Sequence, residues 1–383
     1  MDWEEIQLSK IFRLTNGKSI SNDYSEIENK EYCFPIYGGN SILGYSKKYL
    51  LEEETLIIGR VGEYCGNVNL SCGKIWVSDN ALYISEWFKD FDIKYIYYLL
   101  NYTNLNRYND ATGQPKITQS LLKRIKPKIP LDVEEQTAIA SILSKVDEAI
   151  QSTQNSIKAA EKLKKGLMQN LLTGKLKPDG TWRTEDEFYK DEKFGNVPMG
   201  WETTLFGKRI VVQYGKSQKE IVADNGTIPI YGTGGIIEYG KEALFSNESI
   251  LIGRKGTIDK PFYLNHPFWA VDTTYYVESF EGGNIKYLFY LLQTKNLKSL
   301  NEATGVPSLT RRTLNRLKLI LPPIDIQIEI VKQFDAIENF CLSKEIKAQK
   351  LQRLKKSLMQ NLLTGKIRVD VERINELFKE QQL

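Results

Sequence analysis

The sequence predicts a mixed α/β protein in which two copies of a globular α/β domain are each followed by one long helix. Three observations predict this fold: a long-period internal repeat, two proline-free segments with an apolar stripe at helical spacing, and short β-type runs upstream of each stripe. A chain of 383 residues is also too long for one ordinary core, which favours two or three domains.

The repeat extends over most of the chain. Four pairs of segments match in the same order: NGKS at Asn16 with YGKS at Tyr214, PIYGGNSILGYSKKYL at Pro35 with PIYGTGGIIEYGKEAL at Pro229, ATGQPKITQSLLKRIK at Ala111 with ATGVPSLTRRTLNRLK at Ala303, and LMQNLLTGK at Leu167 and Leu358. The last three pairs differ in offset only slightly (229 − 35 = 194, 303 − 111 = 192, 358 − 167 = 191). Such self-similarity indicates a duplicated unit.

The segment upstream of each long helix has the pattern of a compact α/β domain. TLIIGRVG and SILIGRKG are β-type runs that end in glycine turns, whereas IKYIYYLL and IKYLFYLL have the spacing of a short amphipathic helix. Each half therefore begins with a small mixed domain.

Long helices are expected over residues 136–172 and 327–363, about 37 residues or about 55 Å each. The first apolar stripe consists of Ile139, Leu143, Val146, Ile150, Ile157, Ala160, Leu163, Leu167 and Leu171, and the second of Ile330, Phe334, Ile337, Cys341, Ala348, Leu351, Leu354, Leu358 and Leu362. Gly174 and Gly365 follow the last turns and suit left-handed C-terminal caps. Because such a helix outruns the usual globular element, its stripe is expected to pair with the other helix as a coiled coil.

The charged stretch from Lys175 to Pro198 is the expected linker between the halves. The expected division of the chain is 1–134 for the first domain, 135–173 for the first long helix, 174–198 for the linker, 199–326 for the second domain, 327–365 for the second long helix and 366–383 for a C-terminal tail.

Composition excludes several classes of protein. A hydrophobic fraction of 41% is normal for a globular chain, and no apolar run reaches the roughly 18 residues that span a bilayer. The start MDWEEIQ lacks a basic segment followed by an apolar stretch, so we expect a soluble, cytoplasmic protein. The cysteines form no CxxC pair, and His266 is the single histidine, which disfavours zinc and Ser-His-Asp chemistry.

Three segments resemble catalytic motifs and lack a required residue. GIIEYGKE, at 235–242, has the glycines and lysine of a phosphate loop, but Glu242 stands where a magnesium ligand, Ser or Thr, is needed. NHPF at Asn265 is close to the Asn-Pro-Pro-Tyr signature of amino-methyltransferases, but His266 replaces a proline. GNVNLSCG lacks the GxGxxG spacing. We therefore expect no catalytic residue, metal ligand or cofactor in this chain.

A net charge of only +4 means that nucleic-acid binding would depend on local basic patches. Two such patches occupy equivalent places: Lys116, Lys123, Arg124, Lys126 and Lys128 in the first half, and Arg311, Arg312, Arg316 and Lys318 in the second. Each lies within or directly after an ATGxPx[IL]T motif, whose Thr118 or Thr310 is the expected N-cap of a basic helix. The motif fits a phosphate site beside Lys116 or Arg311 and Arg312, and equally a capped structural helix packed by leucines.

The second candidate is Gly-Arg-x-Gly, which carries Arg60 in the first half and Arg254 in the second. An arginine on a tight turn can bind guanine edges or clamp a phosphate, and it can equally be a surface residue of a structural turn. A motif shared by both halves favours a backbone contact, whereas residues that read bases should differ. The full set of expected DNA-binding residues is Lys18, Asn40, Ser41, Arg60, Gln114, Lys116, Thr118, Lys216, Thr233, Arg254, Lys255, Ser308, Thr310, Arg311 and Arg312.

Together these segments resemble the specificity subunit of Type I restriction-modification systems. The resemblance rests on the two LMQNLLTGK helix ends, on IPLDVEEQ and LPPIDIQ before the helices, and on FGNVPMGWE before the second domain; it covers the chain up to about Arg368. The entry to the second long helix, DIQ at 325–327, is one residue shorter than its counterpart leading to Gln136. We expect this difference only to shorten the loop before the helix.

The resemblance implies two target-recognition domains held apart by an antiparallel helix pair with a pseudo-two-fold axis, each domain binding one half of a bipartite double-stranded DNA site. It also implies two modification subunits that dock on the helices and transfer methyl groups to adenine, and restriction subunits that cleave DNA. S-adenosylmethionine, ATP and magnesium would then be bound by those partners. The expected partner-binding residues are Lys158, Lys162, Lys165, Lys350, Lys355 and Lys356.

Two other functions remain open from the sequence. A coiled-coil adaptor that does not bind DNA would have no reason to keep basic clusters at matching places in both halves. A stand-alone methyltransferase with fused recognition domains would need the cofactor and catalytic motifs that the sequence lacks.

Overall fold

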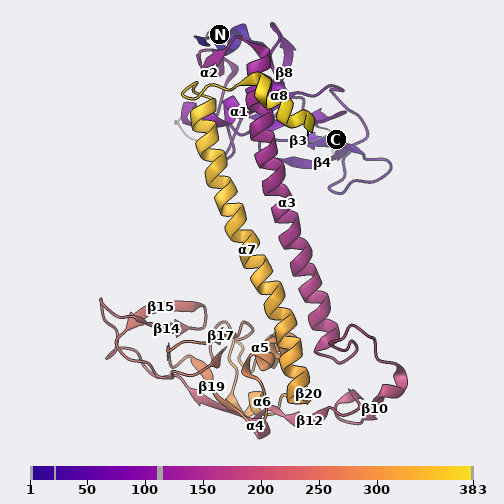
Figure 1. Cartoon of the computed structure of the whole chain (residues 1–383), viewed down its shortest axis with the longest axis vertical. Coiled ribbons are helices and arrows are strands. Elements are labelled where there is room, and N and C mark those ends of the chain that lie inside the picture. Colours follow the sequence, from indigo (N-terminus) through magenta and orange to yellow (C-terminus); the bar gives the residue numbers. More distant parts are fainter. Residues whose placement is uncertain (1–2, 21–22, 110–114, 381–383) are drawn as a thin grey trace. The chain divides into compact units, whose positions relative to one another are not determined.

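The fold is described from a computed structural model that covers residues 3–20, 23–109 and 115–380. The chain forms two compact units (Figure 1). The first unit consists of Met1–Gln154 and Ile346–Leu383, and the second of Asn155–Glu345. Each unit therefore contains one globular domain and parts of both long helices.

The globular domain of the first unit is built from two small sheets and one main helix. Its strands are β1 (Trp3–Glu5), β2 (Phe12–Asn16), β3 (Phe34–Tyr37), β4 (Ile42–Ser46), β5 (Leu56–Gly59), β6 (Val68–Leu70), β7 (Trp76–Val77), β8 (Ala81–Trp87) and β9 (Lys128–Pro130). Its helices are α1 (Ile93–Thr103) and α2 (Gln119–Leu122), with 3-10 turns η1 (Leu8–Lys10) and η2 (Leu105–Tyr108). The strand orders are β2-β8-β5-β6 and β4-β3-β7, and β1 pairs with β9.

The second unit repeats this topology. Its strands are β12 (Glu202–Leu205), β13 (Ile210–Tyr214), β14 (Ile228–Gly232), β15 (Gly235–Gly240), β16 (Ser249–Gly253), β17 (Phe262–Leu264), β18 (Trp269–Ala270), β19 (Thr274–Phe280) and β20 (Lys318–Leu321). Its helices are α4 (Phe206–Arg209), α5 (Ile285–Gln293) and α6 (Arg311–Asn315), with the turn η4 (Leu297–Leu300). The orders β13-β19-β16-β17 and β15-β14-β18, with β12 paired to β20, match the first unit strand for strand. The predicted duplication and the predicted short helices α1 and α5 are confirmed.

The long helices are α3 (Val133–Leu171) and α7 (Ile324–Leu362), each of 39 residues. Both begin three residues before the expected start and end one residue before the expected end. Gly174 and Gly365 follow them with φ of 70°, the left-handed conformation expected of a glycine cap. The predicted helix ends are therefore confirmed.

In each unit α3 and α7 pack side by side and run antiparallel (Figure 1). In the first unit Lys355 forms an ion pair with Asp147 at 2.6 Å, and in the second Lys164 pairs with Glu338 at 2.6 Å. Moving 17 residues forward on α3 thus moves 17 residues back on α7 (164 − 147 = 355 − 338 = 17). The same register holds in both units, as a coiled coil requires.

The stripe prediction was wrong for one pair of equivalent residues, Leu163 and Leu354, which are 56% and 48% exposed. A two-helix pair buries only a narrow seam, so an apolar residue beside the seam stays at the surface. The first residues of each stripe pack against a globular domain and not against the other long helix alone. Ile139 and Leu143 lie in the core of the first domain. Ile330 and Phe334 pack likewise in the core of the second.

A buried glutamine joins each long helix to its domain. Gln136 accepts a hydrogen bond from the amide of Asp92, which caps α1, and donates one to the Pro130 carbonyl. Gln327 makes the same two bonds in the second unit, to the Asn284 amide and the Pro322 carbonyl. The short α-helix, the last strand and the long helix of each unit are thereby fixed to one another.

The linker and the tail carry more structure than the sequence predicted. Within 174–198 there is a 3-10 turn, η3 (Glu185–Glu187), and a hairpin of β10 (Phe188–Asp191) and β11 (Gly195–Pro198). The tail forms α8 (Val371–Glu380), which follows the ion pair of Arg368 with the fully buried Glu135. None of the helices within the described ranges is both long and apolar enough to cross a membrane.

Candidate nucleic-acid interface

Five loops of the first domain meet at one edge of its sheets, and we call this surface the loop edge. The loops are 16–18, 38–41, 59–62, 77–81 and 115–119. Main-chain hydrogen bonds tie four of them together: Lys18 to Val77 at 2.9 Å, Arg60 to Asn80 at 2.9 Å, Gly62 to Pro115 at 2.9 Å and Ile117 to Arg60 at 2.8 Å, each written from amide to carbonyl. Gly39 of the remaining loop, 38–41, lies against Gly59. The Gly-Arg-x-Gly turn and residues 115–118 of the ATGxPx[IL]T motif, which are far apart in sequence, therefore lie side by side.

The second domain has the same loop edge, formed by 214–216, 232–235, 253–256, 270–274 and 307–311. Its amide-to-carbonyl bonds are Lys216 to Ala270 at 2.8 Å, Arg254 to Thr273 at 2.8 Å, Gly256 to Pro307 at 2.8 Å and Leu309 to Arg254 at 2.9 Å. The repeated motifs thus encode one local structure twice.

The glycines of this turn are needed for two different reasons. A Cβ on Gly59 would lie 2.3 Å from the Gly39 carbonyl oxygen, so only glycine allows the two loops to approach. Gly62 and Gly256 have φ of 81° and 94°, a conformation that other residues rarely adopt. The turn is therefore fixed by backbone geometry.

Arg60 and Arg254 are held at the loop edge by equivalent bonds. The Arg60 guanidinium donates to the Asp79 carbonyl at 3.4 Å, and that of Arg254 donates to the Asp272 carbonyl at 3.0 Å. No ion pair joins either guanidinium to a carboxylate within the ranges that the structure describes. Both side chains are half-buried and keep their charge available for an anionic ligand.

Thr118 and Thr310 are confirmed as N-caps, since their hydroxyls accept from the amides of Leu121 and Thr313 at 3.4 and 3.2 Å. The helices they cap, α2 and α6, have only four and five residues. So short a helix carries little of the aligned dipole that attracts phosphate. The structure therefore favours the structural role of these caps, and the exposed Lys116 and half-buried Arg311 supply the charge beside them.

Lys18 and Lys216 lie in exposed turns that a tryptophan fixes in both units. The indole of Trp76 donates to the Lys18 carbonyl at 3.0 Å, and that of Trp269 donates to the Lys216 carbonyl at 2.9 Å. Both lysine side chains are exposed. The two equivalent tryptophans thus stabilise the same turn of the loop edge in both units.

The residues expected to read bases lie on the same edge where the structure describes them. The Asn40 side chain accepts from Asn67 at 2.8 Å in the exposed β3–β4 turn, which also contains Ser41. Thr233 lies beside the turn at Gly256, and Ser308 forms a bridge with Lys255. Exposed Arg312 follows on α6. Gln114 lies outside the described residues. The assignment of all these residues to DNA remains a prediction.

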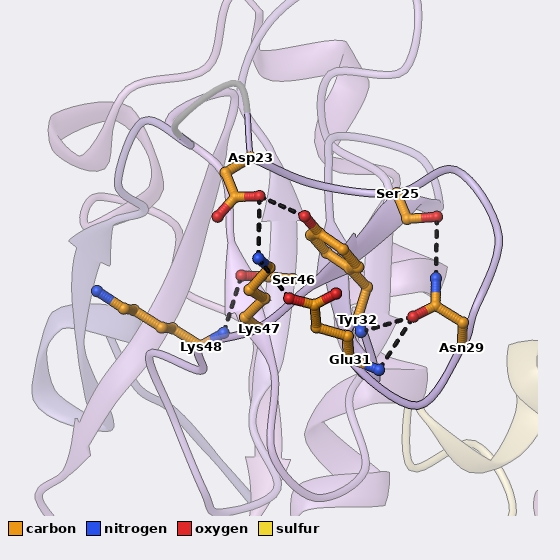
Figure 2. A network of polar contacts seen from close by, with 8 residues as sticks. All are labelled: Asp23, Ser25, Asn29, Glu31, Tyr32, Ser46, Lys47 and Lys48. Carbon is orange, nitrogen blue, oxygen red and sulfur yellow. Dashed lines mark hydrogen bonds and ion pairs between the residues drawn. The ribbon is translucent and has the colours of Figure 1, made fainter.

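A polar network fixes a loop that differs between the two units. Lys47 on the segment after β4 forms ion pairs with Glu31 at 2.7 Å and Asp23 at 3.5 Å (Figure 2). Tyr32 donates to Asp23, and this hydrogen bond lowers the pKa of the Asp23 carboxyl. Asn29 accepts from the amides of Glu31 and Tyr32, both at 3.0 Å, which closes the tip of the loop.

The structure adds residues that the sequence analysis missed. Tyr214, 44% exposed, has the guanidinium carbons of Arg254 and Arg311 at 5.3 and 5.9 Å from its ring centroid. The equivalent residue of the first unit is Asn16, whose side chain accepts from Gln119 at 3.3 Å. The mismatch between NGKS and YGKS in the repeat was the signal that could have found them.

The expected partner-binding lysines divide into two groups. Lys158, Lys162, Lys165, Lys350 and Lys356 are exposed on the long helices. Lys355 instead pairs with Asp147 and lies over the ring of Tyr98, 5.4 Å from its centroid. The exposed Leu163 and Leu354, which the stripe pattern predicted to be coiled-coil core, are near lysines of the first group in sequence.

Two of the three segments close to catalytic motifs have a structural role. Residues 235–240 form strand β15, so they are not a loop that leads into a helix. The His266 ring makes a hydrogen bond with the Tyr231 hydroxyl at 3.1 Å. Within the described ranges, no three histidine, cysteine, aspartate or glutamate side chains are grouped as a metal site requires.

Comparison with known proteins gives consistent matches. The profile of the Type I restriction modification DNA specificity domain matches residues 1–162 and 211–356. The Type I restriction enzyme MjaVIII specificity subunit of Methanocaldococcus jannaschii is 25% identical over 96% of this chain and 93% of its own length. The EcoprrI specificity subunit of Escherichia coli is 33% identical over 43% of this chain and 39% of its own length.

Solved structures agree on the fold. The S subunit of the Type I restriction-modification system from M. genitalium superposes with a TM-score of 0.69 at 18% identity, covering 94% of this chain and 96% of that one. A chain of a type I R-M system superposes with a TM-score of 0.52 at 14% identity, covering 95% and 98%. Since the family profile matches more than half of the sequence, this chain belongs to the Type I restriction-modification DNA specificity family.

Proposed function

We propose that this chain is the sequence-reading subunit of a Type I restriction-modification complex and that each unit reads one half of a bipartite DNA target. The observation that carries the proposal is the loop edge, which is built twice with the same arginine in the same turn. A protein that reads two half-sites needs two equivalent surfaces, and family membership supplies the context.

Within each loop edge the shared and the divergent residues have different roles. Arg60 and Arg254 contact the phosphate backbone, because both units need the same positioning contact whatever their sequence. Residues that differ between the units, such as Asn40 and Thr233, contact base edges.

Equivalent residues of the two repeats exchange partners in the helix pair. Lys164 pairs with Glu338 in one unit, and their repeat equivalents Lys355 and Asp147 pair in the other. A pseudo-palindromic reader suits a target of two separated half-sites.

Two modification subunits dock on the exposed faces of the long helices. Each face has an exposed leucine with exposed lysines near it, Leu163 with Lys162 and Lys165, and Leu354 with Lys356 and Lys350. Exposed apolar residues at equivalent positions favour an interface. Restriction subunits join this assembly in the cytoplasm, and the partners bind S-adenosylmethionine, ATP and magnesium.

The test is reconstitution with the modification subunit from the same system. The purified chain alone is expected to leave DNA unmethylated and uncut, whereas the mixture methylates adenine in one bipartite motif. Methylation mapping of genomic DNA identifies the motif. Adenine methylation by the rigorously purified single chain would contradict the division of roles, and a mixture that methylates no defined motif would contradict sequence reading.

A further inference from the structure

The two loop edges differ at one pair of positions beside the shared arginine. Residue pairs Asn16/Gln119 and Tyr214/Arg311 occupy equivalent places in the first and second unit. Asn16 ends β2 and pairs across the sheet with Leu82, just as Tyr214 ends β13 and pairs with Tyr275. The strand pairing at this position is therefore the same in both units, and the side chains differ.

In the second unit these side chains form a stack. The guanidinium carbons of Arg254 and Arg311 are 5.3 and 5.9 Å from the Tyr214 ring centroid, within cation-π range. Tyr275 packs edge-on against Tyr214 with ring centroids 5.1 Å apart. Arg311 thus contacts the Tyr214 ring, which in turn packs against the Tyr275 ring.

The support continues into the backbone of the loop edge. The Tyr275 hydroxyl donates to the Leu309 carbonyl at 3.2 Å, and the Leu309 amide donates to the Arg254 carbonyl at 2.9 Å. Burial and the neighbouring Tyr214 raise the pKa of Tyr275 to about 12, so its hydroxyl stays protonated as a donor. In the first unit Leu82 stands in place of Tyr275 and lacks this bond.

The first unit presents amides instead of a cation. Gln119 donates to the Asn16 carboxamide oxygen at 3.3 Å, and Asn16 is exposed at the end of its strand. Two mutually bonded carboxamides offer both a donor and an acceptor, the combination that recognises the N6 and N7 atoms of adenine. A fixed guanidinium offers two donors, the combination that recognises O6 and N7 of guanine.

We propose that this position pair is a specificity switch, which makes the second unit select a guanine through Arg311 and the first unit select an adenine through Asn16 and Gln119. The inference rests on the proposed function and deepens it. Tyr214 positions Arg311 through the cation-π contact with its guanidinium. Arg254, which the first unit shares as Arg60, stays a backbone contact.

The test exchanges the pair in the full chain assembled with its modification subunit. Tyr214→Asn combined with Arg311→Gln gives the second unit the side chains of the first. In this variant the preferred base pair at one position of the second half-site is expected to change from G·C to A·T, with at least a tenfold change in preference. The first half-site and the spacer should stay unchanged, and methylation mapping measures all three. The reciprocal variant, Asn16→Tyr with Gln119→Arg, is expected to introduce a G·C preference in the first half-site.

A matched control removes one arginine charge at a shared position. Arg316 is exposed at the end of α6, and its first-unit equivalent is Arg124. Arg316→Gln is therefore expected to weaken binding without changing the motif. A double variant that methylates the original motif with its original selectivity would overturn the inference while leaving the proposed function intact.

A second variant keeps the test decisive if the double variant assembles poorly. Arg311→Lys retains the charge and the contact with Tyr214 but lacks the two-pronged donor geometry. It is expected to keep methylation active while relaxing the guanine preference at that one position. Undiminished preference in Arg311→Lys would overturn the inference, whereas an unmodified chain that reads no motif would count against the proposed function itself.

Discussion

At the scale of single residues, the loop edge separates side chains that both units share from those that they do not. Arg60 and Arg254 belong to the first kind, and each is fixed by a main-chain carbonyl rather than by a carboxylate. A side chain with the same support in two surfaces that read different sequences suits the one feature that all duplexes share, the phosphate backbone.

We predict that Arg60→Ala and Arg254→Ala each weaken binding to all related sequences by a similar factor. Loss of one phosphate contact should lower the slope of log affinity against log salt by about one unit. Titration of fluorescent duplexes with the assembled complex at several salt concentrations measures the slope. Lys89→Ala, which removes a charge at an exposed position after β8, is the control. Relaxed selectivity at a single base position with an unchanged slope would identify a base contact instead.

Sequence alone was sufficient for residues whose role depends on backbone geometry and repetition. Thr118 and Thr310 were predicted as caps because an N-cap is a local feature, and the structure confirms both. Lys355 could not be separated from its neighbours, because its partner Asp147 is far away in sequence. Tyr214 was missed for the same reason, since its two arginines come from separate loops.

At the scale of secondary-structure elements, the tail with its helix α8 occurs once, as the linker hairpin does. Arg368 donates two hydrogen bonds to Glu135, at 2.6 and 2.7 Å, and the Glu135 side chain is fully buried at the start of α3. The guanidinium also lies near Trp3, with its carbon 5.9 Å from the ring centroid. The tail is thereby attached to the first strand and to the first long helix.

We predict that Arg368→Met lowers the free energy of unfolding of the first unit by about 3–5 kcal/mol, because it leaves a buried carboxylate without its cation. Urea unfolding followed by circular dichroism measures the change. Lys366→Met, which removes an exposed charge two residues earlier, should change it by less than about 0.5 kcal/mol. Adding Glu135→Gln to Arg368→Met should restore part of the loss; equal instability of the single and double variants would show that the carboxylate is not the cause.

The helices could be predicted from the sequence because their signals are local and long. An apolar spacing over many residues, no proline and a closing glycine fixed the ends of α3 and α7 to within three residues. The hairpin in the linker and α8 in the tail were not predicted. Both segments occur once, so the repeat gave no second copy to compare, and their charged compositions are typical of loops.

At the scale of the whole molecule, the duplication places one exposed leucine at equivalent points of the two long helices. We predict that Leu163→Glu and Leu354→Glu each weaken assembly with the modification subunit at least tenfold while leaving stability within about 0.5 kcal/mol, because an exposed side chain contributes little to the fold. Analytical size exclusion of the mixed proteins measures assembly.

The control for this prediction is Leu342→Glu on α7. Leu342 is also exposed, at 56%, but its repeat equivalent is Gln151, so it is not part of a duplicated surface. Unchanged assembly in both Leu163→Glu and Leu354→Glu would show that the modification subunits dock elsewhere. A loss of assembly in Leu342→Glu equal to theirs would mean that any added charge on the helices disrupts it.

The last prediction concerns the spacer between the two half-sites, whose length we expect the helix pair to set. The ion-pair register determines where the helices can be lengthened without misaligning them. Within the first unit, position 152 of α3 is opposite 350 of α7, so insertions after Ser152 and after Gln349 face each other. Insertions after Ile150 and Cys341 are equivalent in the repeat but do not face each other, because Ile150 is opposite Gln352.

One heptad inserted at each facing position keeps the apolar seam in phase and lengthens the pair by about 10 Å. The preferred spacer should then lengthen by about three base pairs, at about 3.4 Å each, with both half-sequences unchanged. Three base pairs also rotate the duplex by about 100°, since one turn takes about 10 base pairs, so methylation should be slower than with the original spacer. Genome-wide methylation mapping with the modification subunit measures the spacer, and the original length in a folded, active variant would mean that the helices do not measure the site.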